Sequence, residues 1–147
     1  MTIERDPFEL SRFVDAQAPV YDSVVEELTA GRKVGHWMWF VFPQIAGLGQ
    51  SWMAERYAIS GREEARAYAE HPVLGSRLNA CTQLVLSVEG RSARQIFGGI
   101  DELKFRSCLT LFERSAADPA IFRAALAKYF AGEPDPLTLD LLARQAR

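Results

Sequence analysis

The sequence has little of what membrane, secreted and nucleic-acid-binding proteins require. Its 147 residues include only 2 cysteines, too few for a disulfide framework. Its longest dense apolar run, Trp37 to Phe42, is far shorter than the roughly 20 residues of a membrane-spanning helix. The formal net charge is −2, so no strong positive field would attract nucleic acid or an anionic membrane. We expect a soluble protein that binds neither nucleic acid nor a membrane.

Signals for export and for metal binding are also missing. Residues 1–8 hold acidic residues and a proline where a secretory signal peptide would need a basic start and an apolar stretch. Cys81 and Cys108 lie in apolar segments of helical spacing, which favours neither a disulfide nor a zinc site. His36 and His71 stand outside any His-Glu-x-x-His or Cys-x-x-Cys motif. We expect a cytoplasmic protein with reduced thiols, no required metal and no cofactor.

The chain does have enough apolar side chains to build a core. Hydrophobic residues make up 48%, aromatic residues 11% and charged residues 24% of the sequence, a composition that excludes intrinsic disorder. A chain of this length buries one hydrophobic core comfortably and two with difficulty. No internal repeat, low-complexity stretch or linker divides it. We therefore expect residues 1–147 to form a single domain.

Helix start and stop signals recur along the chain, with little strand-like alternation between them. The pattern predicts an all-α fold of about seven short helices with one irregular aromatic-rich segment. The expected helices cover Pro7–Ala16, Val20–Ala30, a stretch from a Ser60-x-x-Glu63 capping box through Tyr68, Pro72–Val88, a short turn from Ser92 through Phe97, Asp101 to about Arg114, a stretch from Asp118-Pro119 through Phe130, and one from Asp135-Pro136 onward.

Several polar residues are expected to act at helix ends. Asp6 should cap the first helix, with Pro7 at its first position, and Ser92 should cap the short turn that follows it. His71, directly before Pro72, suits a capping role better than a catalytic one. In the helix from Asp101 the apolar residues expected to face inward are Leu103, Leu109, Leu111 and Phe112.

The segment from Val34 to Ser51 fits neither an amphipathic helix nor a clean strand. Its aromatic run favours an irregular or extended segment that is largely buried, with polar groups at its ends. His36, Trp37, Trp39 and Gln44 could line a pocket that stacks a flat ligand and recognises its edges. The competing interpretation is that the aromatic residues are core and that the polar side chains satisfy buried backbone groups.

A second candidate group lies further along the chain. Asp101, Lys104 and Ser107 are spaced three residues apart in a predicted helix, so they can share one face. An ammonium beside a carboxylate and a hydroxyl can bind an anion or take part in proton transfer. The alternative is an ordinary exposed Asp–Lys pair with a neighbouring serine. We predict Lys104, His36 and Asp101 as catalytic residues, and Trp37, Trp39, Gln44 and Ser107 as ligand-binding residues.

Several stretches together resemble a bacterial family of unknown function whose members are often labelled calpastatin. They are Asp6-Pro7-Phe8, Arg12-Phe13-Val14, Ala16-Gln17, His36 to Phe40, Phe42-Pro43-Gln44, Gly47 to Ser51, Tyr57-Ala58-Ile59, His71 to Gly75, Ile96-Phe97-Gly98 with Asp101 and Lys104, and Thr110-Leu111-Phe112. The resemblance covers nearly the whole chain but implies no activity. A calpastatin is a long, disordered inhibitor rich in Lys, Pro and Ser, so we reject that label for this compact, aromatic-rich chain.

The layout of three shorter stretches is similar to a family that handles NAD- and ADP-ribose-derived molecules. These stretches are Glu63-Glu64-Ala65, His71 to Gly75 and Ile96-Phe97-Gly98. The likeness implies a class of ligand and identifies no catalytic residue.

Two functions fit the sequence. The first is a small-molecule binding protein or enzyme that uses an aromatic pocket for a nucleotide- or ribosyl-like compound. The second is a helical protein-interaction or stress-associated module without catalytic activity, which could be a homodimer whose aromatic segment faces a partner.

Overall fold

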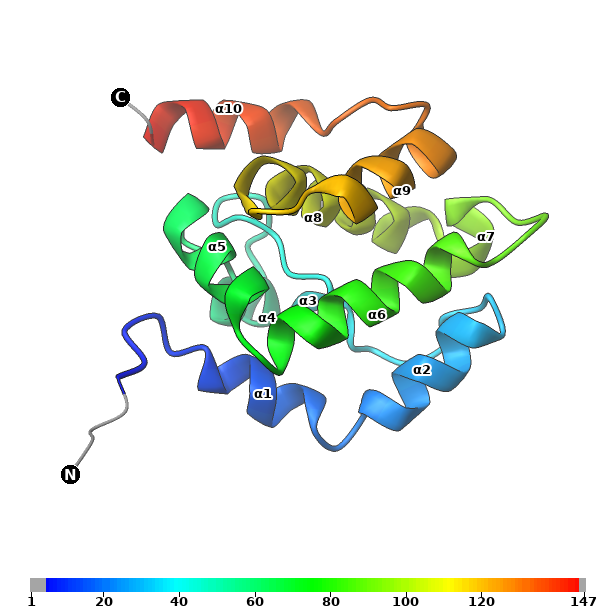
Figure 1. Cartoon of the computed structure of the whole chain (residues 1–147), viewed down its shortest axis with the longest axis horizontal. Helices are drawn as coiled ribbons and strands as arrows, with labels where there is room; N and C mark the ends of the chain where they lie inside the picture. Colours follow the sequence, from blue (N-terminus) through cyan, green and yellow to red (C-terminus); the bar gives the residue numbers. More distant parts are fainter. Residues whose placement is uncertain (1–4, 146–147) are drawn as a thin grey trace.

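In the computed structural model, which describes residues 5–145, the chain folds into helices joined by loops (Figure 1). The all-α prediction is confirmed, but these residues form ten helices where about seven were expected. None of the described helices is both long enough and apolar enough to span a membrane. The helices are α1 (Ser11–Gln17), α2 (Tyr21–Thr29), α3 (Met38–Val41), α4 (Trp52–Arg56), α5 (Arg62–Glu70), α6 (Leu74–Leu86), α7 (Ala93–Phe97), α8 (Gly99–Ser115), α9 (Ala120–Phe130) and α10 (Pro136–Gln145).

The predicted caps at Ser92 and His71 are confirmed. The Ser92 hydroxyl accepts a hydrogen bond from the backbone N–H of Gln95, and the Gln95 side chain accepts one from the Ser92 N–H, which completes a capping box at α7. His71 Nδ1 accepts hydrogen bonds from the N–H groups of Val73 and Leu74 at 3.1 and 3.2 Å. Both side chains therefore satisfy backbone donors that a helix start leaves free.

The first helix begins later than predicted. Asp6 accepts hydrogen bonds from the N–H groups of Leu10 and Ser11, at 2.7 and 2.9 Å, and α1 starts at Ser11. Glu9, which lies between Asp6 and the start of α1, has a φ of 52°, and this conformation is incompatible with a continuous helix from Pro7. The carboxylate of Asp6 is thus a cap, but for a helix that starts about one turn further on.

The predicted capping box between Ser60 and Glu63 does not form, because Ser60 bonds to a different glutamate. The Ser60 N–H and hydroxyl both donate to Glu64 rather than to Glu63, at 2.9 and 2.8 Å. The helix α5 starts at Arg62, after Gly61. Glu64 replaces its neighbour because it is the inward-facing residue, only 3% exposed, whereas Glu63 faces solvent.

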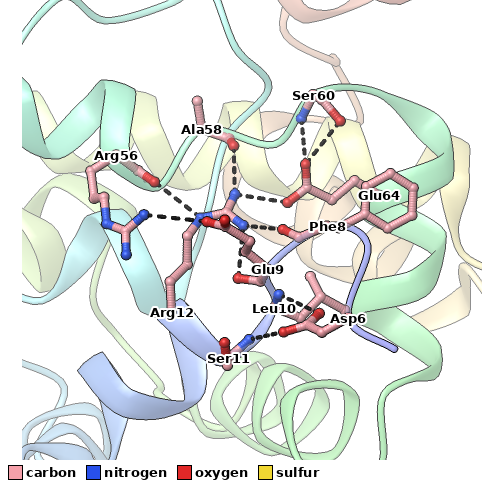
Figure 2. Close-up of polar contacts among 10 residues, drawn as sticks. All are labelled: Asp6, Phe8, Glu9, Leu10, Ser11, Arg12, Arg56, Ala58, Ser60 and Glu64. Atoms are coloured by element: carbon pink, nitrogen blue, oxygen red, sulfur yellow. Dashed lines mark hydrogen bonds and ion pairs between the residues drawn. The ribbon is translucent and has the colours of Figure 1, made fainter. Parts of the chain in front are cut away.

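A buried ion pair fastens α1 to the start of α5 (Figure 2). Arg12 lies 2.8 Å from Glu64, and their side chains are 9% and 4% exposed. The same guanidinium donates to four backbone carbonyl oxygens, and the carboxylate also accepts from Ser60. A buried pair is tolerated when its remaining hydrogen-bonding capacity is used in this way. The four carbonyls belong to Phe8, Glu9, Arg56 and Ala58.

The longest helix, α8, packs against α5, α7, α9 and α10. In Figure 1, α10 lies on one side of it and α1 and α2 lie on the opposite side of the molecule. Its inward face includes Leu109, Leu111 and Phe112, as predicted. The prediction that Leu103 also faces inward is wrong, because this residue is 60% exposed. It lies on the opposite face of the helix from the buried Phe105, beside a surface cavity.

The aromatic segment is largely buried and mostly irregular, as predicted, but it contains one helical turn that the pattern did not predict. Phe42 is fully buried, and Phe40 is 7% exposed. The turn is α3, and the short helix α4 that follows the segment was also not predicted. An isolated parallel bridge joins Ile45 to Ile59, with the Ile59 N–H donating to the Gln44 carbonyl at 2.8 Å. This bridge anchors the segment to the chain before α5.

Candidate functional site

The loop that leads into α3 is held by one carboxylate. Glu27, on α2, accepts hydrogen bonds from the N–H groups of Val34 and Gly35 and from the indole N–H of Trp37, at 2.6, 2.7 and 3.1 Å. Burial alone would raise the pKa of Glu27, but these hydrogen bonds outweigh it and the pKa is lowered from 4.5. The Trp37 side chain is only 2% exposed and belongs to the core.

The next part of the segment is fixed by a buried polar network. The Gln17 amide donates to the Phe40 carbonyl at 2.6 Å and to the Tyr68 hydroxyl at 2.9 Å. Arg77 donates to the amide oxygen of the same glutamine at 3.3 Å. The backbone at Phe40 is thus fixed and the Phe40 side chain is buried. The side chain of the preceding residue, Trp39, is only partly buried.

Trp39 lines a cavity of about 520 Å³ on one side of α8. Four of the seven predicted site residues meet here, although they come from two separate parts of the sequence. Gln44 lies beyond α3, and Lys104 and Ser107 lie on α8. A volume of this size is that of a small-molecule pocket. The remaining lining residues are Ile45, Gly47, Leu48, Gly49, Gln50, Ser51, Ala54, Tyr57, Leu103, Arg106, Asp135 and Leu137.

One wall of the cavity is a hydrogen-bonded junction between α8 and the start of α10. The Ser107 hydroxyl donates to Asp135 at 2.9 Å, and the same carboxylate accepts from the N–H and hydroxyl of Thr138. Arg106 donates to the carbonyl oxygens of Glu133 and Pro134 at 3.0 and 2.9 Å. The Asp135 carboxylate and the Arg106 guanidinium are therefore occupied in holding the wall together.

A second, smaller hollow of about 320 Å³ lies on the other side of Trp39. It is lined by His36 and Asp101 among the predicted residues, and by Lys33. Trp39 borders both hollows. The structure therefore places Lys104 in the first hollow and His36 in the second.

Two lysines converge on one carboxylate between these hollows. Lys33 Nζ lies 2.9 Å and Lys104 Nζ lies 3.5 Å from the two oxygens of Asp101. The Lys104 ammonium also lies 4.8 Å from the centre of the Trp39 ring, a cation–π contact. Asp101 occupies the first turn of α8, where the helix dipole favours a carboxylate. The arrangement can bind an anion and can exchange protons between neighbouring groups.

Several lining residues were not predicted. From the sequence, Gly47 and Gly49 are expected in the irregular segment without a role in a site, and Asp135 is expected at the start of a helix. Gly47 has a φ of 105°, a conformation that favours glycine, and a Cβ there would meet the Leu141 side chain at 3.3 Å. The glycines in this stretch were a signal for a tight loop, which here forms a cavity wall.

The cysteines are remote from this chemistry. Cys81 and Cys108 are both free and buried. Burial raises the pKa of Cys81 to about 11 and raises the pKa of Cys108 well above its usual range. Thiols in this state are poor nucleophiles. Among residues 5–145, no group of three or more His, Cys, Asp and Glu side chains is arranged to hold a metal ion.

The fold and the cavity define a small helical protein with a partly aromatic pocket beside its central helix. A family model described as protein of unknown function (DUF1810) matches residues 7–142, and the chain belongs to this family. The predicted resemblance to a family of unknown function is thus confirmed, while the likeness to proteins that handle NAD- and ADP-ribose-derived molecules stays a prediction.

A solved structure shares this fold. The crystal structure of the conserved hypothetical protein Rv1873 from Mycobacterium tuberculosis has 60% sequence identity to this chain and a TM-score of 0.93. The match covers 94% of this chain and 99% of that chain. None of the curated proteins matches the sequence.

Proposed function

We propose that this protein binds a small molecule, nucleotide- or ribosyl-like, in the 520 Å³ cavity beside α8. The observation that carries the proposal is the meeting of Trp39, Gln44, Lys104 and Ser107 around one hollow. The chemistry of these four residues alone predicts them as site residues. An apolar cavity with a few convergent polar groups is the usual form of a ligand site.

Each lining group has a distinct part in the proposed site. The rings of Trp39 and Tyr57 offer flat surfaces to a planar ligand, and the Gln44 amide offers hydrogen bonds to its edges. The Ser107 hydroxyl donates to Asp135, so only its oxygen is left, as an acceptor. Lys104 offers a positive charge. Trp37 has no part in this proposal because its ring is buried in the core.

If the protein is an enzyme, proton transfer falls to Lys104, His36 and Asp101. The first of these faces the larger hollow and the other two face the smaller one, and all three lie near Trp39. A ligand that spans both hollows would therefore reach every candidate catalytic residue.

A thermal-shift screen against nucleotides, NAD, ADP-ribose, ribosyl compounds and simple anions tests the proposal. A ligand present at about 100 times its Kd stabilises the folded state by about 2.7 kcal/mol, a shift of several degrees in Tm. The Lys104→Met variant should lose the shift without losing its fold, and Arg66→Met should keep it. Arg66 is a suitable control because it is exposed, pairs with Glu70 and lines neither hollow. Shifts that are equal in both variants would reject the site.

One observation favours the second function, an interaction module. Five large apolar residues are between 60% and 75% exposed, and contiguous exposed apolar side chains can mark a protein interface. They are Val34, Trp52, Ile100, Leu103 and Leu137. Leu103 and Leu137 line the larger hollow and Ile100 lines the smaller one. A ligand site therefore accounts for three of the five, and we favour the small-molecule function.

A further inference from the structure

Among the side chains that line the two hollows beside Trp39, basic groups outnumber acidic ones. Lys33 and Lys104 share the single carboxylate of Asp101, at 2.9 and 3.5 Å. The side chain of Lys33 is 6% exposed, and its ammonium also donates to the carbonyl of Gly35. Lys33 is thus fully engaged, whereas Lys104 is 24% exposed and has Asp101 as its ion-pair partner at the longer distance.

The other charged groups of the two hollows do not cancel this excess. Arg106 and Asp135 are of opposite charge, and both are hydrogen-bonded within the wall. His36 is exposed and lines the smaller hollow, and it brings no negative charge to it. Among the side chains that line the hollows, two ammonium groups therefore face one free carboxylate. Glu27 lines neither hollow but interacts electrostatically with Lys33, so Lys104 is the lysine whose charge is least neutralised.

We infer that this site selects ligands that carry an anionic group, a phosphate or a carboxylate, next to a planar ring. The anionic group would bind Lys104 as the second negative partner of the lysine pair, while the ring lies in the apolar hollow beside Trp39. This inference rests on the proposed function and adds the charge of the ligand to it. Charge-assisted hydrogen bonds of this kind are about twice as strong as neutral ones.

The three tryptophans allow a site-resolved test by nuclear magnetic resonance. Protein labelled with ¹⁵N at tryptophan gives one indole N–H signal each for Trp37, Trp39 and Trp52. The probes are two matched pairs, adenosine monophosphate with adenosine and nicotinate with nicotinamide. Each pair keeps the ring and changes the charge, and the two pairs separate a preference for phosphate from one for carboxylate.

We expect the anionic member of at least one pair to shift the Trp39 signal with a Kd about tenfold or more below that of its neutral partner, since a hydrogen bond to a charged group contributes about 1.5–3 kcal/mol. The Trp37 signal should stay in place, because its N–H is bonded to Glu27. Lys104→Met should remove the difference within the pair, and Arg66→Met should keep it. Asp101→Asn should tighten binding of the anion several-fold, because the lysines lose their internal counter-ion.

The possible failures are distinguishable. Equal Kd values for charged and neutral probes at Trp39 would overturn the selection of anions and leave the proposed function standing. A Trp39 signal that none of the four probes shifts would reject the anion site and count against the proposed function as well. An anion preference that survives Lys104→Met would overturn the role of the lysine pair.

Discussion

At the scale of single residues, two tryptophans two positions apart have different surroundings. Trp37 is buried and donates its indole N–H to Glu27, whereas Trp39 borders both hollows. The sequence predicts both as ligand-binding residues because both lie in the same aromatic run. Their difference depends on the α2 carboxylate and on the buried carbonyl of Phe40, which are contacts between distant segments. Residue type alone could not separate them.

Glu27 should contribute to stability in a pH-dependent way. Replacing Glu27 with Gln should reduce the free energy of unfolding by about 1–2 kcal/mol at pH 7, because charge-assisted hydrogen bonds to the 34–37 loop become neutral ones. Since the folded-state pKa is lowered, this contribution is complete above the unfolded pKa of about 4.5 and is lost as the pH falls through the folded value. Urea unfolding at pH 7 and below pH 4 measures it.

The matched control for this prediction is Glu26→Gln, a change at the neighbouring exposed position. It should alter stability little at either pH. A loss at Glu27 that persists unchanged in acid, or an equal loss at Glu26, would contradict the assigned role.

At the scale of elements, the helices with a strong start signal were predicted well. Asp118-Pro119 lies directly before α9, and Asp135 lies directly before Pro136, the first residue of α10. Asp118 accepts a hydrogen bond from the Ala120 N–H, and Asp135 accepts one from the Thr138 N–H. The short helices α3 and α4 were not predicted, because helices of one turn depend on tertiary contacts more than on their own pattern. The predicted partner of Ser60, Glu63, was also wrong. The ion pair with Arg12, a contact between distant segments, holds the Glu64 carboxylate beside Ser60.

The ion pair between α1 and α5 should matter more than any surface pair. Arg12→Met leaves Glu64 buried without its cation, which should lower the free energy of unfolding by about 3–5 kcal/mol. Removing both charges, in Arg12→Met with Glu64→Met, should cost less than the sum of the two single changes. Denaturant unfolding of the three variants gives the coupling.

Arg66→Met is the comparison for this pair. Arg66 and Glu70 form an i, i+4 pair whose side chains are 62% and 58% exposed, so its loss should cost less than about 1 kcal/mol. Equal losses for Arg12→Met and Arg66→Met would show that the buried pair does not hold α1 in place.

At the scale of the whole molecule, the fold decides which predicted residues meet. Spacing places Lys104 and Ser107 on one helix, and the aromatic segment places Trp39 near Gln44. That these two groups line one cavity follows from the packing of the irregular segment beside α8, which no local pattern encodes. The same packing moves His36 to the neighbouring hollow. The all-α class was predictable because helical periodicity is local, whereas the site is not.

If the exposed apolar side chains serve a ligand site, the protein should be a monomer. Size-exclusion chromatography with light scattering should give a mass near 16.5 kDa. Twice that mass, reduced to the monomer by Leu103→Glu, would instead favour the homodimeric interaction module, because that change places a charge among the exposed apolar residues.

The most direct test of the ligand site is a crystal structure of the protein with adenosine monophosphate. We predict electron density for the ring against Trp39 in the larger hollow and for the phosphate within hydrogen-bonding distance of Lys104. Density for the nucleotide elsewhere, such as in the hollow between Phe8 and Leu142, with an empty cavity beside Trp39, would contradict the central claim.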